Sequence, residues 1–263
     1  MLNNKDLEKK QLELPNKEYF TNLGVEYDNY SVLALSVYFA NANYLVNTNN
    51  DSTLLEVGCG SDSAIHDKFK GSWFGIDVVK EDRHGKPTLA SDMASVHDMP
   101  YENEFFDNVL SNQSIEHWHE YGINFKMALS EVNRVLKLGG KFTFNFPVHL
   151  HGHKYFVLNN LDAVHKELKS TGFEIQEIRE YTSKELQPYL GWLKCGFPTL
   201  YLKLFSKNFK KTSAVLEYDV VKTENSSINH EKNKPLIKKS RIQKRMHHGF
   251  LVLFFNILNR IKL

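Results

Sequence analysis

Short apolar runs of strand length alternate with helical stretches through the middle of the chain, and this alternation constrains the fold most. The runs cover residues 53–57, 73–77, 87–91, 105–111 and 141–146, and two more strand candidates cover 173–181 and 214–223. Between the fourth and fifth runs, apolar residues recur at helical spacing from Phe125 to Leu136. Gly139 and Gly140 follow, and they predict the end of that helix. Strands that alternate with helices imply right-handed crossovers, so the sequence predicts an α/β fold with a doubly wound parallel sheet.

The regions around this central domain (residues 53–223) have their own patterns. Residues 1–52 predict a helical lead-in, because apolar side chains recur at helical spacing between Tyr30 and Leu45. Residues 182–212 form an apolar and aromatic insert on the predicted substrate side, and residues 224–235 are a polar linker. Residues 236–263 are basic and then apolar. No apolar run approaches the roughly 20 residues that a transmembrane helix needs.

The net charge of +2 conceals an uneven distribution. Residues 1–202 carry 19 basic and 27 acidic side chains, whereas residues 203–263 carry 14 basic and 4 acidic ones. This split indicates an acidic catalytic body with a basic end that seeks a partner. A basic cluster joined to an apolar helix is typical of segments that lie in an anionic membrane interface. Packing on the protein's own sheet or in a dimer interface is an equally open interpretation of residues 236–263, and no nucleic-acid partner is expected.

Two cysteines, Cys59 and Cys195, are too few for a disulfide framework. The first residues also lack the apolar stretch of a secretory signal. We therefore expect a cytoplasmic protein, peripheral at the inner face of the membrane if the C-terminal segment binds lipid.

The first chemical motif is Glu56-Val57-Gly58-Cys59-Gly60, in which a buried strand ends in a glycine turn that opens toward a predicted helix near Ser63. Glycine lets the backbone approach a ligand closely, and a helix N-terminus favours anionic groups. The motif lacks the third glycine of the dinucleotide fingerprint, which disfavours NAD as the ligand.

A second motif, Phe74-Gly75-Ile76-Asp77, ends the next strand about twenty residues later. In a doubly wound sheet this position places the Asp77 carboxylate beside the glycine turn, where it can accept hydrogen bonds from both hydroxyls of a ribose. Two further motifs follow in order, from Asp107 to His117 and from Glu131 to Gly140.

With these four motifs the sequence resembles the class I S-adenosylmethionine-dependent methyltransferases, particularly the group that includes ubiquinone and small-molecule methylases. The resemblance covers residues 50–147 well and 155–223 more loosely. It implies a seven-stranded Rossmann-like sheet with a late antiparallel strand at 214–223, and S-adenosylmethionine as the cofactor. It also implies the cofactor-binding residues, which are Glu56, Gly58, Cys59, Gly60, Asp77, Val78, Asp92, Met93 and Asn112. Asp98 is the alternative to Asp92 for the adenine amino group.

Methyl transfer to a hydroxyl needs a base that takes the proton, and a positioned histidine is a common solution. The candidates are His149 and His151, which form a cluster with His153 just after the fifth strand, and His117. A metal is not expected, because the ligand position of some quinone-branch relatives is held here by Gln113, a poor ligand for a hard cation. Cys59 is interpreted as a packing residue.

The substrate is the least constrained feature. The turn at Phe146-Pro147 and His149, with the aromatic loops that follow, resembles methyltransferases encoded with bacterial surface-polysaccharide enzymes. This resemblance implies a hydroxyl acceptor on a sugar, a nucleotide sugar or a lipid-linked saccharide. Quinone-type and other small-molecule acceptors stay open. A catalytically inactive scaffold also stays open, because Asp62 stands where the family often has a third glycine. The oligomeric state is also open.

Overall fold

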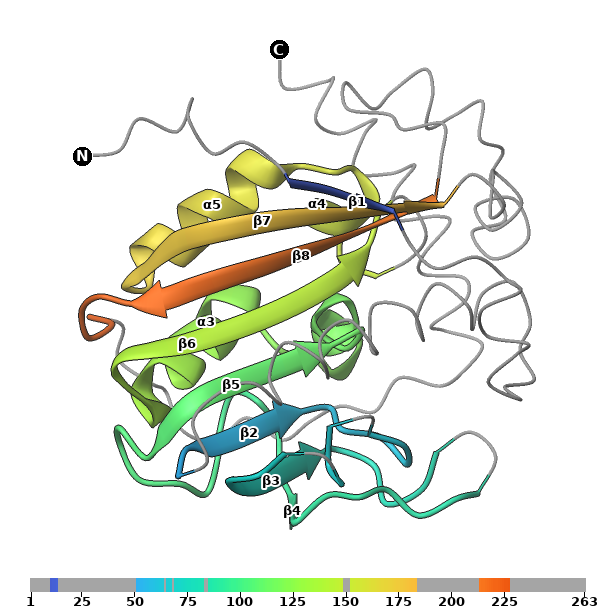
Figure 1. Cartoon of the computed structure of the whole chain (residues 1–263), viewed down its shortest axis with the longest axis vertical. Coiled ribbons are helices and arrows are strands. Elements are labelled where there is room, and N and C mark those ends of the chain that lie inside the picture. The colour runs from blue at the N-terminus through green and yellow to red at the C-terminus, as the bar shows by residue number, and fades with distance from the viewer. Residues whose placement is uncertain are drawn as a thin grey trace.

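The structure is a computed structural model, and it describes residues 10–13, 51–63, 65–67, 69–82, 85–148, 152–183 and 213–227. In this part of the chain eight strands form one sheet, in the order β1-β7-β8-β6-β5-β2-β3-β4 (Figure 1). The strands are β1 (Lys10–Glu13), β2 (Thr53–Val57), β3 (Ser72–Asp77), β4 (Asp92–Met93), β5 (Phe106–Asn112), β6 (Leu136–Pro147), β7 (Phe173–Ser183) and β8 (Ser213–Lys222).

Strands β2 to β8 form the seven-stranded sheet that the resemblance implied. Each neighbouring pair from β4 through β3, β2 and β5 to β6 is parallel. Strand β8 lies between β6 and β7 and is antiparallel to both, which confirms the late antiparallel strand. The α/β prediction and the Rossmann-like methyltransferase sheet are therefore confirmed.

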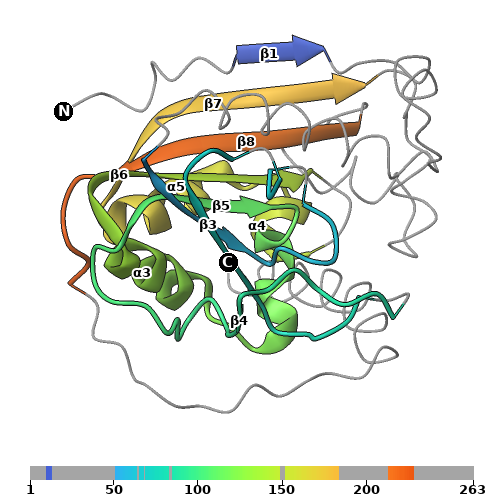
Figure 2. The ribbon, with the colours of Figure 1, turned by 60° about the horizontal axis from the view of Figure 1, so that its bottom comes forward.

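The described helices are the 3-10 helix η1 (Ile115–Tyr121), α3 (Phe125–Val135), α4 (Lys154–Val157) and α5 (Leu161–Ser170). Helix α3 begins where the Asn124 side chain accepts hydrogen bonds from the backbone N–H groups of Lys126 and Met127. Helices α3 and α4 each contact α5 and β6, and α5 packs against β7, so these helices form one layer on one face of the sheet (Figure 2).

The two faces of β6 and β8 differ because side chains alternate along a strand. Phe142, Phe144 and Phe146 belong to the apolar core, and Phe144 stacks on Tyr218 with ring centroids 5.0 Å apart. The intervening residues Thr143 and Asn145 are polar and almost completely buried. The sheet therefore carries an aromatic core on the helix side and a polar row on the other.

The structure corrects the prediction at the N-terminus. Residues 10–13, inside the expected helical lead-in, form strand β1, which pairs in parallel with β7 at the edge of the sheet. A strand of this kind depends on the neighbour with which it pairs, and that neighbour is far away in the sequence. Residues 1–9 and 14–50 lie outside the described residues.

Gly139 and Gly140 do not end the helix as expected. Helix α3 ends at Val135, and both glycines lie inside β6. The pairing of β5 with β6 shifts in register between Phe106 and Asn108, beside these glycines, and Gly139 has a φ of 77°. The same conformational freedom that suits a helix end here accommodates an irregularity in a strand.

Two smaller expectations also differ. The strand expected at 87–91 is replaced by the two-residue β4 at Asp92–Met93, and Pro87 makes only an isolated bridge to Glu81. Near Ser63 the described residues 65–67 form a turn where a helix was expected.

No helix in the described ranges has the length and the apolar content needed to cross a membrane. The basic segment 236–263, residues 228–235 of the linker and residues 184–212 of the insert lie outside the described residues.

Candidate active site

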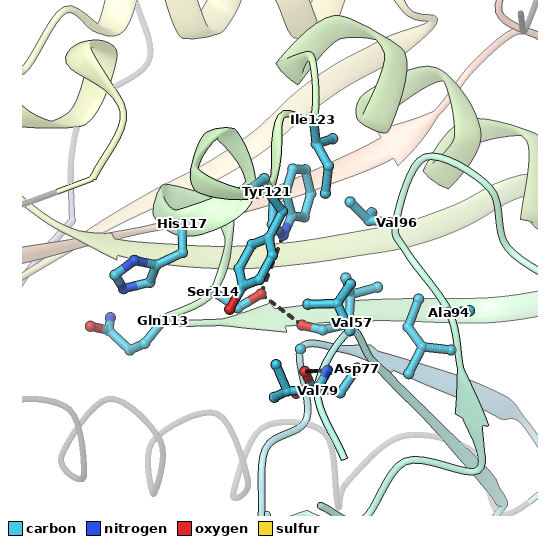
Figure 3. A pocket seen from close by; sticks show the side chains of 14 residues that line it. Val57, Asp77, Val79, Ala94, Val96, Gln113, Ser114, His117, Tyr121 and Ile123 are labelled. Carbon is cyan, nitrogen blue, oxygen red and sulfur yellow. Dashed lines mark hydrogen bonds between the residues drawn. The ribbon is translucent and has the colours of Figure 1, made fainter. Parts of the chain in front are cut away.

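A cleft of about 210 Å³ opens where β2, β3 and β5 end (Figure 3). Gly58 lines it from the turn after β2, and Asp77 and Val78 line it from the end of β3. Gln113 and His117 line it from the chain that follows β5. Ligand sites of open α/β sheets lie at this edge, beyond the carboxyl ends of the parallel strands.

Gly58 lies against Ser114, and this contact explains why the position needs glycine. Its φ is 71°, and a Cβ built on it would lie 2.4 Å from Ser114 Oγ. The Ser114 hydroxyl donates a hydrogen bond to the Val57 carbonyl over 2.9 Å and accepts one from Trp118 Nε1 over 3.3 Å. Ser114 therefore ties the ends of β2 and β5 to η1, in the space that a larger residue at position 58 would fill.

Asp77 is held at the cleft by the backbone of two loops. Its Oδ2 accepts a hydrogen bond from the Gly60 N–H over 3.0 Å, and its Oδ1 accepts one from the Val79 N–H over 3.1 Å. A carboxylate has about four acceptor sites, so both oxygens retain the capacity to bind the hydroxyls of a ligand.

The cleft is apolar at one end and polar at the other. Figure 3 places Ala94 and Val96 on one side and Gln113 and His117 on the opposite side, with Asp77 between them. An apolar wall suits a flat heterocycle, and the polar end suits charged or hydroxylated groups. This division fits a nucleoside joined to a polar chain.

His117 is oriented by a carboxylate at the polar end. Its Nδ1 lies 2.8 Å from Glu120 Oε1, whereas its Nε2 lies 3.9 Å from Glu116 Oε1, beyond hydrogen-bonding distance. Glu116 is fully buried, and burial raises its pKa to about 7 although His117 opposes the shift. His117 was predicted from the sequence, whereas Glu120 was not, although its spacing of three residues from His117 on a helical turn was the available signal.

His149 and His151 lie outside the described residues, whereas His153 is described and serves the fold. Its Nδ1 accepts a hydrogen bond from the Tyr155 N–H over 3.3 Å at the start of α4, and its ring centroid lies 4.4 Å from that of Tyr155. Burial lowers the pKa of His153 to about 4. This histidine therefore caps α4 and packs against Tyr155.

Glu56 and Cys59 of the first motif are not among the residues that line the cleft. Glu56 accepts hydrogen bonds from Ser63 Oγ over 2.6 Å and from Trp73 Nε1 over 3.1 Å, and burial raises its pKa to about 7. Cys59 is buried with its sulfur toward Gly75, and burial raises the pKa of its thiol to about 12. A buried thiol with a raised pKa is a poor nucleophile, which agrees with the packing interpretation of Cys59, and its contact with the cofactor stays a prediction.

Three other predicted cofactor residues lie beside the cleft lining. The Asp92 carboxylate accepts a hydrogen bond from the Tyr101 hydroxyl over 2.8 Å, and Met93 is half exposed. Asn112 accepts a hydrogen bond from Asn145 Nδ2 over 2.8 Å. Their neighbours Ala94 and Gln113 line the cleft instead, so the contacts of these three residues with the cofactor stay predictions.

The turn that should receive the cofactor is open. Apart from its chain neighbours, no atom of the described residues lies within 4 Å of a Cβ built on Gly60, which has a φ of 64°. Asp62, where the third glycine is missing, is exposed and pairs with Lys86 over 2.7 Å. The residues of the cleft therefore fit a nucleoside cofactor. The described residues hold no group of three or more His, Cys, Asp or Glu side chains arranged to bind a metal ion.

Comparisons with known proteins agree with this geometry. Residues 55–144 match the family model described as a methyltransferase domain. An uncharacterised protein of Methanocaldococcus jannaschii is 28% identical over 124 residues, and the match covers 44% of this chain and 45% of that protein. The chain thus spans about half the length of this curated relative.

Solved structures are similar in fold at low identity. The YcgJ protein from Bacillus subtilis is 12% identical with a TM-score of 0.51, and the match covers 71% of this chain and 99% of that chain. A putative methyltransferase from Bacillus halodurans is 16% identical with a TM-score of 0.48, over 70% of this chain and 97% of that chain. Residues 55–144 thus match a methyltransferase domain, the sheet has the Rossmann-like methyltransferase fold, and S-adenosylmethionine is the cofactor that this match supports.

Proposed function

We propose that the protein transfers the methyl group of S-adenosylmethionine to a hydroxyl oxygen of a small molecule or glycan, such as a sugar, a nucleotide sugar or a lipid-linked saccharide. The observation that carries this proposal is the position of His117. It lines the cleft, and its Nδ1 lies 2.8 Å from Glu120 Oε1, so a carboxylate orients the ring and would stabilise its protonated form.

Different residues of the cleft bind different parts of the cofactor. Asp77 accepts hydrogen bonds from the ribose hydroxyls, and the apolar wall with Ala94 and Val96 receives the adenine. The amino-acid end would then lie toward Gln113, and His117 would face the acceptor. When bound, the cofactor supplies an activated methyl group, and the protein aligns the acceptor oxygen with it.

His117 supplies the proton transfer. With its Nδ1–H donating to Glu120, Nε2 takes the proton of the acceptor hydroxyl while the oxygen forms its bond to the methyl carbon. The cofactor would supply the methyl carbon, and its sulfur would keep the electron pair of the bond that breaks. Glu120 stabilises the imidazolium that results. His149 and His151 stay as further candidates for the base.

The choice of a glycan acceptor rests on the sequence resemblance of the region after Phe146.

The alternative of an inactive scaffold was motivated by Asp62, which stands where the family often has a third glycine. Asp62 is exposed, pairs with Lys86 and leaves the space beside Gly60 open, which supports a binding-competent turn.

The test measures methyl transfer from labelled S-adenosylmethionine to nucleotide sugars, glycolipids and quinone precursors. His117→Gln should lower turnover by about 100-fold or more, because general-base catalysis contributes roughly 10²–10⁴-fold. Its affinity for S-adenosylmethionine should stay unchanged in calorimetry. The matched control is His66→Gln, since His66 lies outside the cleft and pairs with Asp67.

Three results would contradict the proposal. A wild-type chain that binds no S-adenosylmethionine favours the scaffold. Methylation of nitrogen or carbon acceptors alone rules out the hydroxyl. Full turnover of His117→Gln removes His117 from the chemistry.

A further inference from the structure

A row of polar side chains crosses the sheet on the face opposite the aromatic core. The strand register aligns Asn112 in β5 with Asn145 in β6, Asn145 with Glu217 in β8, and Glu217 with Arg179 in β7. Asn145 and Glu217 are at most 1% exposed and Arg179 is 6% exposed. Such deeply buried polar groups must be hydrogen-bonded, so each fixes the orientation of the next.

The row determines how the Asn145 amide lies. Glu217 Oε1 accepts hydrogen bonds from Arg179 Nε over 2.7 Å and from the Tyr181 hydroxyl over 3.1 Å. Asn145 Nδ2 donates to Glu217 Oε2 over 3.4 Å and to Asn112 Oδ1 over 2.8 Å. Burial works to lower the pKa of Arg179, but Asp219 and Glu217 raise it, so the guanidinium stays charged. With acceptors on both sides of Nδ2, the amide oxygen of Asn145 must point the other way.

That oxygen holds Gln113 at the cleft. Asn145 Oδ1 accepts hydrogen bonds from the Gln113 backbone N–H over 3.1 Å and from Gln113 Nε2 over 2.7 Å. Gln113 has a φ of 50°, a left-handed conformation that a residue other than glycine adopts only when its surroundings hold it. Because Nε2 is engaged by Asn145, Oε1 is the amide atom left to meet a ligand. Gln113 lines the polar end of the cleft near His117 (Figure 3).

We propose that Asn145 is a positioning residue that holds Gln113, so that Gln113 Oε1 accepts a hydrogen bond from the α-ammonium group of the cofactor. The inference rests on the proposed function through its cofactor. If Asn145 has this role, the affinity for the amino-acid end of S-adenosylmethionine depends on Asn145, which is buried in the sheet, and on Glu217 in the neighbouring strand.

The binding of two ligands distinguishes a positioning role of Asn145 from a purely structural role. S-adenosylhomocysteine carries the α-ammonium group, whereas 5′-methylthioadenosine has the same adenosine and thioether without the amino-acid part. In calorimetry on the full chain, Gln113→Met and Asn145→Leu should each weaken S-adenosylhomocysteine binding about tenfold, the size expected for losing a hydrogen bond to a charged group. Binding of 5′-methylthioadenosine should stay within twofold of the wild type.

Thr143→Val is the matched control. Thr143 donates to Asp219 over 2.7 Å on the same face and in the same strand as Asn145, and this bond does not reach Gln113. This variant should lose thermal stability as Asn145→Leu does and should keep the wild-type affinity for both ligands.

A double variant tests whether the lost affinity for S-adenosylhomocysteine can be restored. Asn145→Asp keeps an acceptor for Gln113 but sets a second carboxylate against Glu217, so S-adenosylhomocysteine affinity should fall. Adding Glu217→Gln supplies a donor to that carboxylate, and affinity should return to within about threefold of the wild type.

Each other outcome overturns the inference. Equal losses for both ligands in Asn145→Leu make the residue structural, and unchanged affinities in Asn145→Leu and Gln113→Met remove both from cofactor binding. A wild-type chain that binds neither ligand overturns the proposed function together with this inference. A wild type that binds both, with variants that match it, overturns this inference alone.

Discussion

The backbone N–H of Gly60 donates a hydrogen bond to Oδ2 of Asp77 over 3.0 Å, so two motifs that lie 17 residues apart in sequence meet at one edge of the sheet. Asp77 thus has two roles. It shapes the glycine turn, and it offers acceptor oxygens to the cleft.

Replacing Asp77 should weaken the binding of the cofactor. Asp77→Ala removes a charged acceptor, which costs roughly 1.5–3 kcal/mol, so affinity for S-adenosylhomocysteine should fall by one to two orders of magnitude in calorimetry. Asp62→Ala removes an exposed carboxylate from a neighbouring turn and serves as the control with unchanged affinity. Wild-type affinity in Asp77→Ala would exclude Asp77 from the site.

Gly58→Ala should disrupt the cleft through a steric clash. A methyl group at this position meets Ser114 Oγ at 2.4 Å, and overpacking of this kind costs about 1–3 kcal/mol in addition to the strain of a positive φ. Gly85→Ala serves as the control for backbone strain without a clash. Gly85 also has a positive φ, of 80°, but apart from its chain neighbours no atom of the described residues lies within 4 Å of a Cβ built on it. Urea denaturation should show a larger loss of unfolding free energy for Gly58→Ala than for Gly85→Ala. Equal losses would contradict the close approach to Ser114.

Glu56 should make folding stability depend on pH. Its pKa is raised from 4.5 to about 7 by burial, so the folded chain binds more protons than the unfolded chain between these values. The stabilisation by the protonated group is fully present below about pH 4.5 and is lost as the pH rises to about 7.

The variant Glu56→Gln removes this titration. The unfolding free energy of the wild type minus that of the variant should therefore fall by about 3 kcal/mol between pH 4.5 and pH 8. Urea denaturation at a series of pH values measures the difference. Glu102→Gln, at an exposed position, provides the comparison. A difference that is constant across this pH range would show that Glu56 does not titrate with a raised pKa.

The C-terminal segment 236–263 should bring the protein to anionic membranes, which suits a lipid-linked acceptor. Each basic residue near such a surface adds about 1 kcal/mol of attraction. The full chain should float with anionic liposomes and not with neutral ones. A chain ending at Asn233 should remain in the soluble fraction. Replacing Lys238, Lys239 and Arg241 by Gln should reduce flotation in the full chain. If the full chain stays with the soluble fraction, and the shorter one becomes unstable or monomeric, the segment is structural.

The sequence by itself determined the order of the central elements and the chemistry of two motifs. Periodicity and turn residues act over a few neighbours, so the bounds of strands β2, β3 and β8 and of helix α3 were predicted close to those observed. The antiparallel direction of β8 was implied only by the family resemblance. Because the carboxyl ends of parallel strands meet at one edge, the positions of Gly58 and Asp77 at those ends also predicted that they share a cleft.

Tertiary structure decided everything that depends on which distant residues meet. Gly139 has the freedom to end a helix or to bend a strand, and pairing with β5 selected the strand. Residues 10–13 became β1 because β7 offers an edge. Ser114 meets the end of β2 across 57 residues, and Asn145 meets Gln113 across 32. No local pattern encodes such contacts, because they form only when the strands are aligned in the sheet.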